Sequence, residues 1–506
     1  MPMPTGKVYL IGAGPGDPGL ITLRGVELLA RADAVLYDYL VNPAILGHCR
    51  PDALKISLGQ HGTGRVMSQD EINLQLAELV KTNSTVIRLK SGDPMIFARA
   101  GEELDFLAQQ SIPFEIVPGV TAALAAAAYA GVPITHRDAA SAVAFVTGQE
   151  DAAKADSSLD YSALAHFPGT LVFYMGVTTA GHWSQALIEA GKSNSTPVAI
   201  LRRVSTPHQH RIDTTLGGVA SAVAQHHLRP PVVFIVGEVA AHGSVWSWFE
   251  KRPLFGQTVL VTRPIDQADD LAKPLAELGA DVLTQPAIEI KPLRLTDTSD
   301  RSLDLLDRFQ WLVFSSANGV RHFFDRLLEP FVQPPRDVRA LGKIKIAAIG
   351  PGTAEELSRY HVKADIVPDE YRAESLAQSL VAGAAGNRFL LVRASRGREI
   401  LAEELTKAGG IVEQLVVYES IDVERADPAI VAKMAAGQIH WTTVTSSAIA
   451  RSLVNLFGDS LRKTKLVSIS PITSATLREL GFEPTAEAKE YTMVGVVAAI
   501  QGRVKE

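Results

Sequence analysis

The sequence predicts an α/β protein built from two domains. Short runs of β-branched and aromatic residues alternate with longer helical segments from one end of the chain to the other. At 506 residues, the chain exceeds what one hydrophobic core usually supports. Near residues 243–256 one pattern ends, and TVLVTRP then opens a new strand. We therefore place the boundary at about residue 251, between domains of residues 1–250 and 251–506.

Eight strands are predicted in the first domain, each a short and mainly apolar run bounded by turn residues. They cover residues 8–12, 34–38, 85–89, 114–117, 142–148, 170–176, 197–201 and 232–237. Helices are predicted between them, over residues 21–32, 68–81 and the alanine-rich 121–131. This order of elements is typical of helices packed on open sheets.

The second domain contains an internal repeat. WLVFSSANGVRHFF and KIAAIGPGTAEEL (from residues 311 and 345) are echoed by WTTVTSSAIARSLV and KLVSISPITSATL (from residues 441 and 465). Each copy has a strand that ends in Ser-Ser, then a strand that ends in a proline-containing turn, then a helix. Such duplication predicts two similar lobes, with hydroxyl groups and N–H-rich turns at the carboxyl ends of strands, where ligands bind in open α/β sheets.

Composition excludes several classes of function. A net charge of −6 gives no general attraction to nucleic acid or to an anionic membrane. The single cysteine, Cys49, excludes an internal disulfide and argues against cysteine-based metal sites, and we predict no metal. No apolar run reaches the ~18–20 residues of a membrane span, and the N-terminus lacks the layout of a signal peptide. We therefore expect a soluble, cytoplasmic protein.

The glycine-rich loop GAGPGDPG, residues 12–19, does not fit a dinucleotide site. Asp17 stands where the fingerprint needs its third glycine, and Pro15 and Pro18 remove backbone N–H groups that could hold phosphate. Similar loops follow other strands at 89–103, 117–123 and 174–176. Small residues there would let an adenosine-like ligand lie against the backbone. Asp38, at the end of a strand, could act as a base or cap the next helix.

These loops carry a family resemblance. GAGPGDPGLITLRG, LYDYLV, RLKSGDPMIFARAGEEL, VPGVTAALAAAAYAGVPITHRD and TLVFYMG together resemble uroporphyrinogen-III C-methyltransferase, of the tetrapyrrole methylase superfamily, over residues 5–245. The resemblance implies two α/β subdomains that bind S-adenosylmethionine in a cleft. It also implies methylation of uroporphyrinogen III at C2 and C7 to give precorrin-2, and a homodimer formed through this domain.

The resemblance also assigns roles to single positions. Asp38 matches the family's proposed proton acceptor, a role that methyl transfer to a pyrrole-derived carbon requires. The S-adenosylmethionine contacts fall on Pro15, Ser91, Gly92, Asp93, Ile96, Thr121, Ala122, Met175 and the backbone near Val204.

The sequence departs from the family at three positions. Gln60 replaces a lysine proposed as a proton donor, and Ser91 and Val204 each replace a glycine. If the backbone φ at position 204 were positive, valine would be strained there. The substrate would carry eight carboxylates, so cationic groups should line the cleft. The candidates are Arg65, Arg99, His136, Arg137, Arg202 and Arg203, of which the HRD stretch with Arg137 and the adjacent pair Arg202–Arg203 are favoured.

The second half resembles uroporphyrinogen-III synthase. The motifs VLVTRP, QPAIEI, VFSSANGV, AAIGPGTAEEL, LVRASRGREIL and VVYES occur in the family's order. The resemblance implies closure of hydroxymethylbilane with inversion of the last pyrrole ring, through a spiro intermediate and without a cofactor. It also implies two discontinuous lobes, one of about 256–290 with 424–506 and the other of about 291–423.

Tyr418 matches the family's tyrosine, which would assist departure of the substrate's hydroxyl group by hydrogen bonding. A purely structural role, as an aromatic side chain packed at the end of a strand, is an equally good interpretation. Substrate carboxylates are expected to meet hydroxyl groups and backbone N–H groups, together with Arg263 and Arg393. The hydroxyl residues are Ser315, Ser316, Thr353, Thr445, Ser446, Ser447 and Thr473.

The sequence therefore predicts a bifunctional enzyme of tetrapyrrole biosynthesis with S-adenosylmethionine as its cofactor. Two alternatives stay open. The first domain could methylate a different corrin carbon, or it could be a methylase-like module that binds without catalysis. The sequence does not decide whether the product goes on to sirohaem or to cobalamin.

Overall fold

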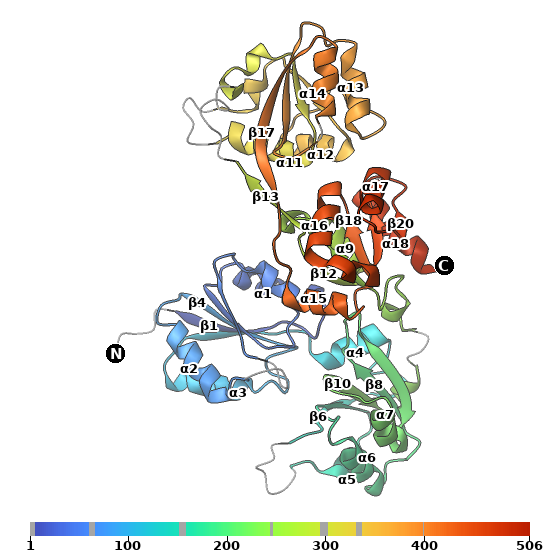
Figure 1. Cartoon of the computed structure of the whole chain (residues 1–506). Coiled ribbons are helices and arrows are strands. Elements are labelled where there is room, and N and C mark those ends of the chain that lie inside the picture. Colours follow the sequence, from blue (N-terminus) through green and yellow to red (C-terminus); the bar gives the residue numbers. More distant parts are fainter. Residues whose placement is uncertain are drawn as a thin grey trace. The chain divides into compact units, whose positions relative to one another are not determined.

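The computed structural model describes residues 6–59, 66–150, 158–242, 246–293, 302–329, 336–397 and 399–505. The chain divides into two compact units, Met1–Gly256 and Gln257–Glu506. Each unit contains two five-stranded sheets covered by helices, so the predicted α/β class is confirmed (Figure 1). Among the described residues, no helix has both the length and the apolar character to cross a bilayer.

The first sheet of the first unit is entirely parallel. Its order is β3 (Leu54–Ser57), β2 (Ala34–Tyr37), β4 (Thr85–Lys90), β1 (Lys7–Gly12) and β5 (Phe114–Val117). Apolar side chains of α2 (Gln69–Leu79) and α3 (Ala100–Gln109) pack in the core on one face. Those of α1 (Leu23–Leu29) pack in the core on the other. All the loops that follow these strands therefore emerge at one edge of the sheet.

The second sheet is mixed. Its order is β6 (Val143–Thr147), β7 (Thr170–Tyr174), β10 (Val232–Val236), β8 (Pro197–Arg202) and β9 (His210–Thr215). The helices α5 (Tyr161–Ala165), α6 (Ala180–Glu189) and α7 (Val219–Gln225) cover one face. Helix α4 (Ala122–Ala130) follows the first sheet in the chain, but its alanines and Tyr129 pack on the other face of the second. This packing joins the two subdomains through one shared core.

One lobe of the second unit is built from both ends of its chain segment. Its parallel sheet has the order β12 (Asp281–Thr284), β11 (Thr258–Val261), β18 (Trp441–Val444), β19 (Lys465–Ser468) and β20 (Ala486–Glu487). Its helices are α9 (Asp269–Glu277), α15 (Pro428–Ala435), α16 (Ser447–Phe457), α17 (Pro471–Glu479) and α18 (Met493–Lys505).

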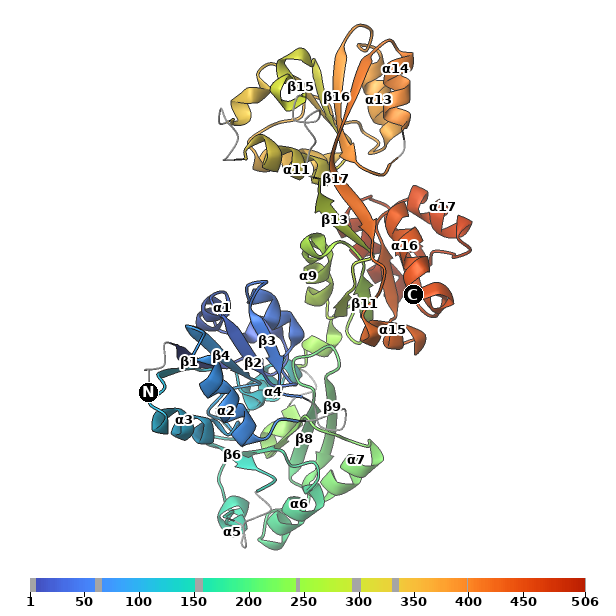
Figure 2. The same ribbon diagram turned by 60° about the vertical axis from the view of Figure 1, so that its left-hand side comes forward.

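The other lobe lies between these segments in sequence. Its sheet has the order β13 (Ile288–Pro292), β17 (Ile411–Asp422), β16 (Arg388–Ala394), β14 (Trp311–Phe314) and β15 (Lys345–Ala348). Its helices are α11 (Ala317–Leu327), α12 (Pro351–Arg359), α13 (Ala373–Val381) and α14 (Ile400–Lys407). The antiparallel strands β13 and β17 lie side by side and lead from this lobe toward the other, as Figure 2 shows.

The eight strands predicted for the first domain all occur, but β3 and β9 were missed. The residues of β3, LKIS, are mostly exposed, and those of β9, HRIDTT, are exposed or half-buried. Both strands lie at an edge of their sheet, so neither has the apolar run by which buried strands are found.

Candidate functional site

Three loops of the first sheet meet in close backbone contact. Gly14 and Gly92 exchange two backbone hydrogen bonds, of 3.2 and 2.8 Å. A Cβ on Gly12 would lie 2.5 Å from the Cα of Gly119, so the loops after β1, β4 and β5 can approach this closely only as glycines. The sequence therefore dictates a compact group of loops at the carboxyl edge of the sheet.

Replacing Gly119 with alanine tests this packing. The new Cβ would collide with the carbonyl oxygen of Gly92 and lie 2.7 Å from the Cα of Gly12. We expect a loss of about 1–3 kcal/mol in the free energy of unfolding and loss of any ligand bound by the loops, measured by thermal unfolding and calorimetric titration. Gly47→Ala is the matched control, because a Cβ there meets nothing described within 4 Å. Equal midpoints for the two variants would contradict this account.

Two carboxylates of these loops are engaged within the protein. Asp93 Oδ1 accepts a hydrogen bond from the N–H of Met95 (2.8 Å), and Oδ2 accepts one from the N–H of Gly119 (3.0 Å). Asp17 accepts from the N–H of Gly19 and from the hydroxyl of Tyr129, 2.8 and 2.7 Å away. Burial raises the pKa of Tyr129, and the Asp17 hydrogen bond adds to that shift. Both aspartates therefore fix the shape of the loops.

Loops of the second subdomain reach the same place. The hydroxyl groups of Thr121 and Tyr174 are 2.7 Å apart, and Tyr174 also accepts a bond from the N–H of Ala123 at 3.0 Å. The N–H of Asp17 donates to Ser205 Oγ at 3.1 Å. The predicted ligand contacts thus lie on five segments, which these hydrogen bonds and the Gly14–Gly92 pair connect. The segments contain Pro15, Ser91–Ile96, Thr121–Ala122, Met175 and Val204.

The condition for strain at Val204, a positive φ, is not met. Positive φ falls on its two neighbours, Arg203 (50°) and Ser205 (58°), while Val204 is absent from the described residues with positive φ. Its side chain is buried and packs in the core shared with α4. Valine at this position is therefore accommodated by the fold.

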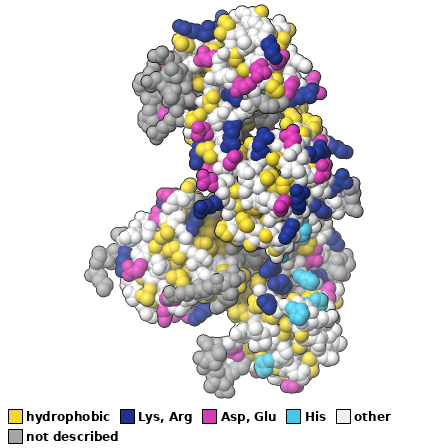
Figure 3. Space-filling view, viewed as in Figure 1, with side chains coloured by type: hydrophobic (Ala, Val, Ile, Leu, Met, Phe, Trp, Pro, Cys, Tyr) yellow, Lys and Arg dark blue, Asp and Glu magenta, His cyan; other side chains and the backbone are white. Residues whose placement is uncertain are grey.

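Apolar side chains are exposed beside these loops. Met95, Phe97 and Met175 are 56%, 40% and 46% exposed, and the ring of Phe97 lies 5.0 Å from that of Tyr174. On the face of the first unit in view in Figure 3, exposed hydrophobic side chains lie among polar ones. Apolar groups next to accessible backbone are the lining that a nucleoside-like ligand needs.

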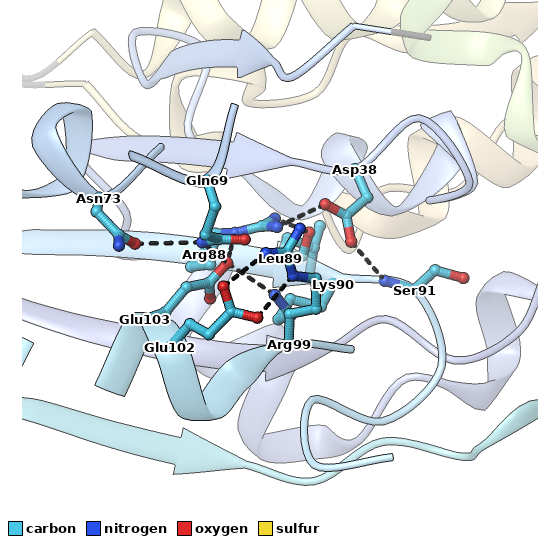
Figure 4. Close-up of polar contacts among 10 residues, drawn as sticks. All are labelled: Asp38, Gln69, Asn73, Arg88, Leu89, Lys90, Ser91, Arg99, Glu102 and Glu103. Atoms are coloured by element: carbon cyan, nitrogen blue, oxygen red, sulfur yellow. Dashed lines mark hydrogen bonds and ion pairs between the residues drawn. The ribbon is translucent and has the colours of Figure 1, made fainter. Parts of the chain in front are cut away.

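Asp38 follows β2 at the same edge of the sheet. Parallel pairing sets Tyr37 beside Leu89 of β4, which brings the Asp38 carboxylate next to Ser91. Its Oδ1 accepts from Arg88 Nη2 at 2.6 Å, and its Oδ2 accepts from the N–H of Ser91 at 3.4 Å (Figure 4). The helix-cap alternative is wrong, because Asn42 caps the turn that begins at Pro43.

The predicted cationic residues of the first unit are partly brought together. Arg202 is half-buried, donates to the carbonyl of Arg229 at 3.0 Å, and lies near Arg203. Burial lowers the pKa of Arg202, and the charges of Arg203 and Arg229 lower it further. Arg137 is exposed on the turn after α4, and Arg99 pairs with Glu102 at 2.6 Å. Gln60 and Arg65 lie outside the described residues.

In the second unit, the repeat puts four helix N-termini at the carboxyl ends of strands. Ser316, Ser446 and Ser470 precede α11, α16 and α17, and each accepts a hydrogen bond from a backbone N–H in the first turn. Gly350 takes the same place before α12, and all four have extended φ between −160° and −174°. Matching geometry in both lobes follows from the matching sequences, and helix N-termini attract carboxylates.

Other predicted contacts of this unit are already engaged within the protein. The side chains of Thr353 and Thr473 are buried, while Ser315 donates to the carbonyl of Val392 at 3.1 Å. Ser447 lies 2.8 Å from the hydroxyl of Thr476, and Thr445 is half-buried at the end of β18. Arg263 pairs with Asp270 at 3.0 Å and Arg393 with Glu399. Their predicted roles in substrate binding therefore stay predictions.

Tyr418 is buried in β17, with its hydroxyl 3.0 Å from Ser316 Oγ at the start of α11. Burial raises the pKa of Tyr418, while hydrogen bonds with Ser316 and Asn318 lower it. The phenol therefore stays protonated at neutral pH and can donate a hydrogen bond. A polar chain continues from Asn318 to Gln267 of the other lobe (2.7 Å) and on to Arg263 (3.2 Å).

His322 stands beside Tyr418 and gives the second unit a pH dependence. The two ring centres are 5.4 Å apart, and burial lowers the pKa of His322, partly opposed by Asp325. As the pH falls below about 6.5, the unfolded chain takes up this proton before the folded chain does, so the free energy of unfolding decreases. We expect His322→Gln to flatten the fall of the unfolding midpoint between about pH 6.5 and 5. An unchanged slope would contradict this assignment.

Four polar residues of these sites were not predicted. Arg88, Lys90 and Glu103 adjoin Asp38, and Asn318 adjoins Tyr418. Arg88 lies in the predicted strand 85–89, and Lys90 follows that strand directly. Residues two positions apart in a strand point to the same face, so only this spacing could have signalled that two cations share one face.

Comparison with known proteins finds a separate family match in each of the two units. Residues 7–220 match the family model "Tetrapyrrole (Corrin/Porphyrin) Methylases", and residues 269–498 match "Uroporphyrinogen-III synthase HemD". The porphyrin biosynthesis protein HemD of Ruminiclostridium josui is 32% identical over 98% of this chain and 96% of its own length. The uroporphyrinogen-III C-methyltransferase of Bacillus subtilis is 37% identical over 71% of this chain and 72% of its own length. A siroheme synthase of Stutzerimonas stutzeri is 47% identical over 51% of this chain and 55% of its own length.

Proposed function

Since the chain belongs to the tetrapyrrole methylases over residues 7–220 and to the uroporphyrinogen-III synthases over residues 269–498, we propose that it catalyses two successive reactions. The second unit closes hydroxymethylbilane to uroporphyrinogen III with inversion of the last ring. The first unit then methylates uroporphyrinogen III at C2 and C7 to give precorrin-2. The observation that carries the methylation is the meeting of five predicted ligand segments beside Asp38.

The residues of the first unit fit S-adenosylmethionine. Gly92 has open space where a Cβ would stand, with Ala122 N the nearest atom at 3.9 Å, so a ligand can lie against the backbone. Met95, Phe97 and Met175 offer exposed apolar contact for an adenine ring. S-adenosylmethionine supplies an activated methyl group when bound. Ser91, Thr121 and Val204 belong to the segments that would hold it.

Asp38 is the proton acceptor in this proposal. Its Oδ1 is engaged by Arg88, whereas among the described residues Oδ2 has only the long contact with Ser91 N; the side chain is 30% exposed. Oδ2 takes up the proton that the substrate carbon skeleton releases after methylation. Arg137, Arg202 and Arg203 would hold substrate carboxylates.

In the second unit, Tyr418 donates a hydrogen bond to the departing hydroxyl group of hydroxymethylbilane. The helix N-termini at Ser316, Gly350, Ser446 and Ser470 supply N–H groups for the acetate and propionate side chains. Because much of this binding goes through the backbone, single side-chain substitutions there would cost little affinity.

One incubation tests the whole proposal. The full chain is given hydroxymethylbilane and ¹³C-methyl S-adenosylmethionine, and the product is examined by ¹³C NMR. Label at C2 and C7 supports both activities, and label at another carbon overturns the assigned position. An inverted macrocycle without label would leave the first unit as a binding module. Closure without inversion would overturn the synthase. We further propose that the chain is cytoplasmic and pairs as a homodimer through its first unit.

A further inference from the structure

Three charged side chains are buried directly behind Asp38. Arg88 and Lys90 alternate along β4 and so point to the same face of the sheet, with 3% and 2% of their side chains exposed. Glu103, from helix α3, lies against both and is fully buried. Charged groups are seldom buried this deeply without a specific arrangement.

The contacts run from Glu103 to Asp38 through Arg88. Glu103 Oε1 accepts from Arg88 Nε at 3.1 Å and from Lys90 Nζ at 2.8 Å. The same guanidinium donates through Nη2 to Asp38 Oδ1 at 2.6 Å, and Nη1 donates to the carbonyl of Leu89 at 3.2 Å. Figure 4 shows Arg88 between the two carboxylates. The guanidinium is therefore held at three of its nitrogens.

Stability alone does not account for this cluster. Desolvation of buried ion pairs offsets most of their attraction, and apolar residues of similar volume would stabilise a core at least as well. Burial lowers the pKa of Lys90, with a further contribution from the charge of Arg88, while Glu103 opposes both. Two cations and two carboxylates balance in charge. What the cluster provides is a fixed direction for Arg88, and hence for Asp38.

We propose that Glu103 is a positioning residue for methyl transfer: it orients Arg88, which engages Asp38 Oδ1 and leaves Oδ2 to accept the proton. This inference rests on the proposed function of Asp38. In the step, the O–H bond forms at Oδ2 while the substrate keeps the electron pair of the bond that it loses. Neither Arg88 nor Glu103 exchanges a proton.

The test separates charge balance from orientation. Glu103→Gln alone leaves two buried cations facing one carboxylate, so it would also destabilise the fold. Adding Lys90→Met removes one cation and restores the balance, but Arg88 then has no charged partner in α3. We expect the double variant to unfold within a few degrees of wild type, with kcat about 100-fold lower. KM and affinity for S-adenosylhomocysteine should stay within about threefold.

Two further variants keep the test decisive if the double variant folds poorly. Arg88→Lys keeps the cation but cannot reach both carboxylates at once, so its kcat should fall to a similar extent. Lys90→Met alone leaves two carboxylates facing one buried cation, so it would also destabilise the fold, but Glu103 stays on Arg88 and kcat should fall far less than in the double variant. In ¹⁵N-arginine-labelled protein, the Arg88 Nε–H signal, assigned by its loss in Arg88→Lys, should exchange with water faster in the double variant.

Recovery of kcat together with stability in the double variant, while Asp38→Asn is inactive, would overturn the positioning role and leave the proposed function standing. Wild-type kcat in Asp38→Asn would overturn both. An Arg88 Nε–H exchange rate that does not change in the double variant would overturn the orientation of Arg88 by Glu103.

Discussion

Asp38→Asn is expected to reduce methyl transfer by about 100- to 10,000-fold, the usual contribution of a positioned general base. Asparagine keeps the shape of the side chain and can still accept the hydrogen bond from Arg88 Nη2. It has no carboxylate oxygen to take up a proton. The measurement is the rate of transfer of labelled methyl groups to uroporphyrinogen III, with S-adenosylhomocysteine affinity as a check on the ligand loops.

The control for this substitution is Asp52→Asn. Asp52 belongs to the same unit, but its side chain is 75% exposed and pairs with Arg50 at 3.2 Å. We expect wild-type methyl transfer from it. Ring closure by the second unit should be unaffected by either substitution. If Asp38→Asn keeps more than about a tenth of the wild-type kcat, Asp38 is not the general base.

Tyr418→Phe is expected to slow ring closure about 10- to 100-fold, just below the range seen when one donor to a developing charge is removed. The phenol is buried and protonated, and it reaches the start of α11 through Ser316. Loss of its hydroxyl removes a hydrogen bond worth about 1 kcal/mol of stability, so the fold should persist. The measurement is the rate of uroporphyrinogen III formation from hydroxymethylbilane.

Tyr360→Phe serves as its matched control. Tyr360 belongs to the same lobe, where its ring stacks on Phe324 at 4.3 Å. It should keep wild-type ring closure, and both variants should keep wild-type methyl transfer. An unchanged rate for Tyr418→Phe would mean that the residue serves packing in the core of the lobe, the alternative that the sequence left open.

The glycine-rich loops of the first unit were predictable because their chemistry is local. Gly14 and Gly92 have positive φ, while Gly12 and Gly119 leave no room for a Cβ, so all four positions require glycine. Each lies at or just after the end of a strand whose apolar run is plain in the sequence. The repeat in the second unit was visible for the same reason, since matching residues adopt matching helix starts at Ser316 and Ser446.

The surroundings of the candidate catalytic groups were not predictable in this way. Arg88 and Glu103 are 15 positions apart, and a charged residue in a strand or helix is as a rule a solvated one. The partners of Asp17 and Asp93 were unpredictable for the same reason. Their carboxylate oxygens accept hydrogen bonds from Tyr129 and Gly119, which lie elsewhere in the chain. Positive φ falls on Arg203 and Ser205 and not on Val204, which the sequence alone could not decide.

By itself, the sequence determined the α/β class, the first-unit strands apart from two edge strands, the repeat and the family. These depend on apolar runs, on glycine and proline at turns, and on motif order, which are properties of neighbouring residues. Only the tertiary structure decided which charges are buried and what each polar group contacts. Burial and long-range hydrogen bonds depend on segments that meet after folding, so Asp38 acquired its partner Arg88, and Arg88 its partner Glu103, only in the folded chain.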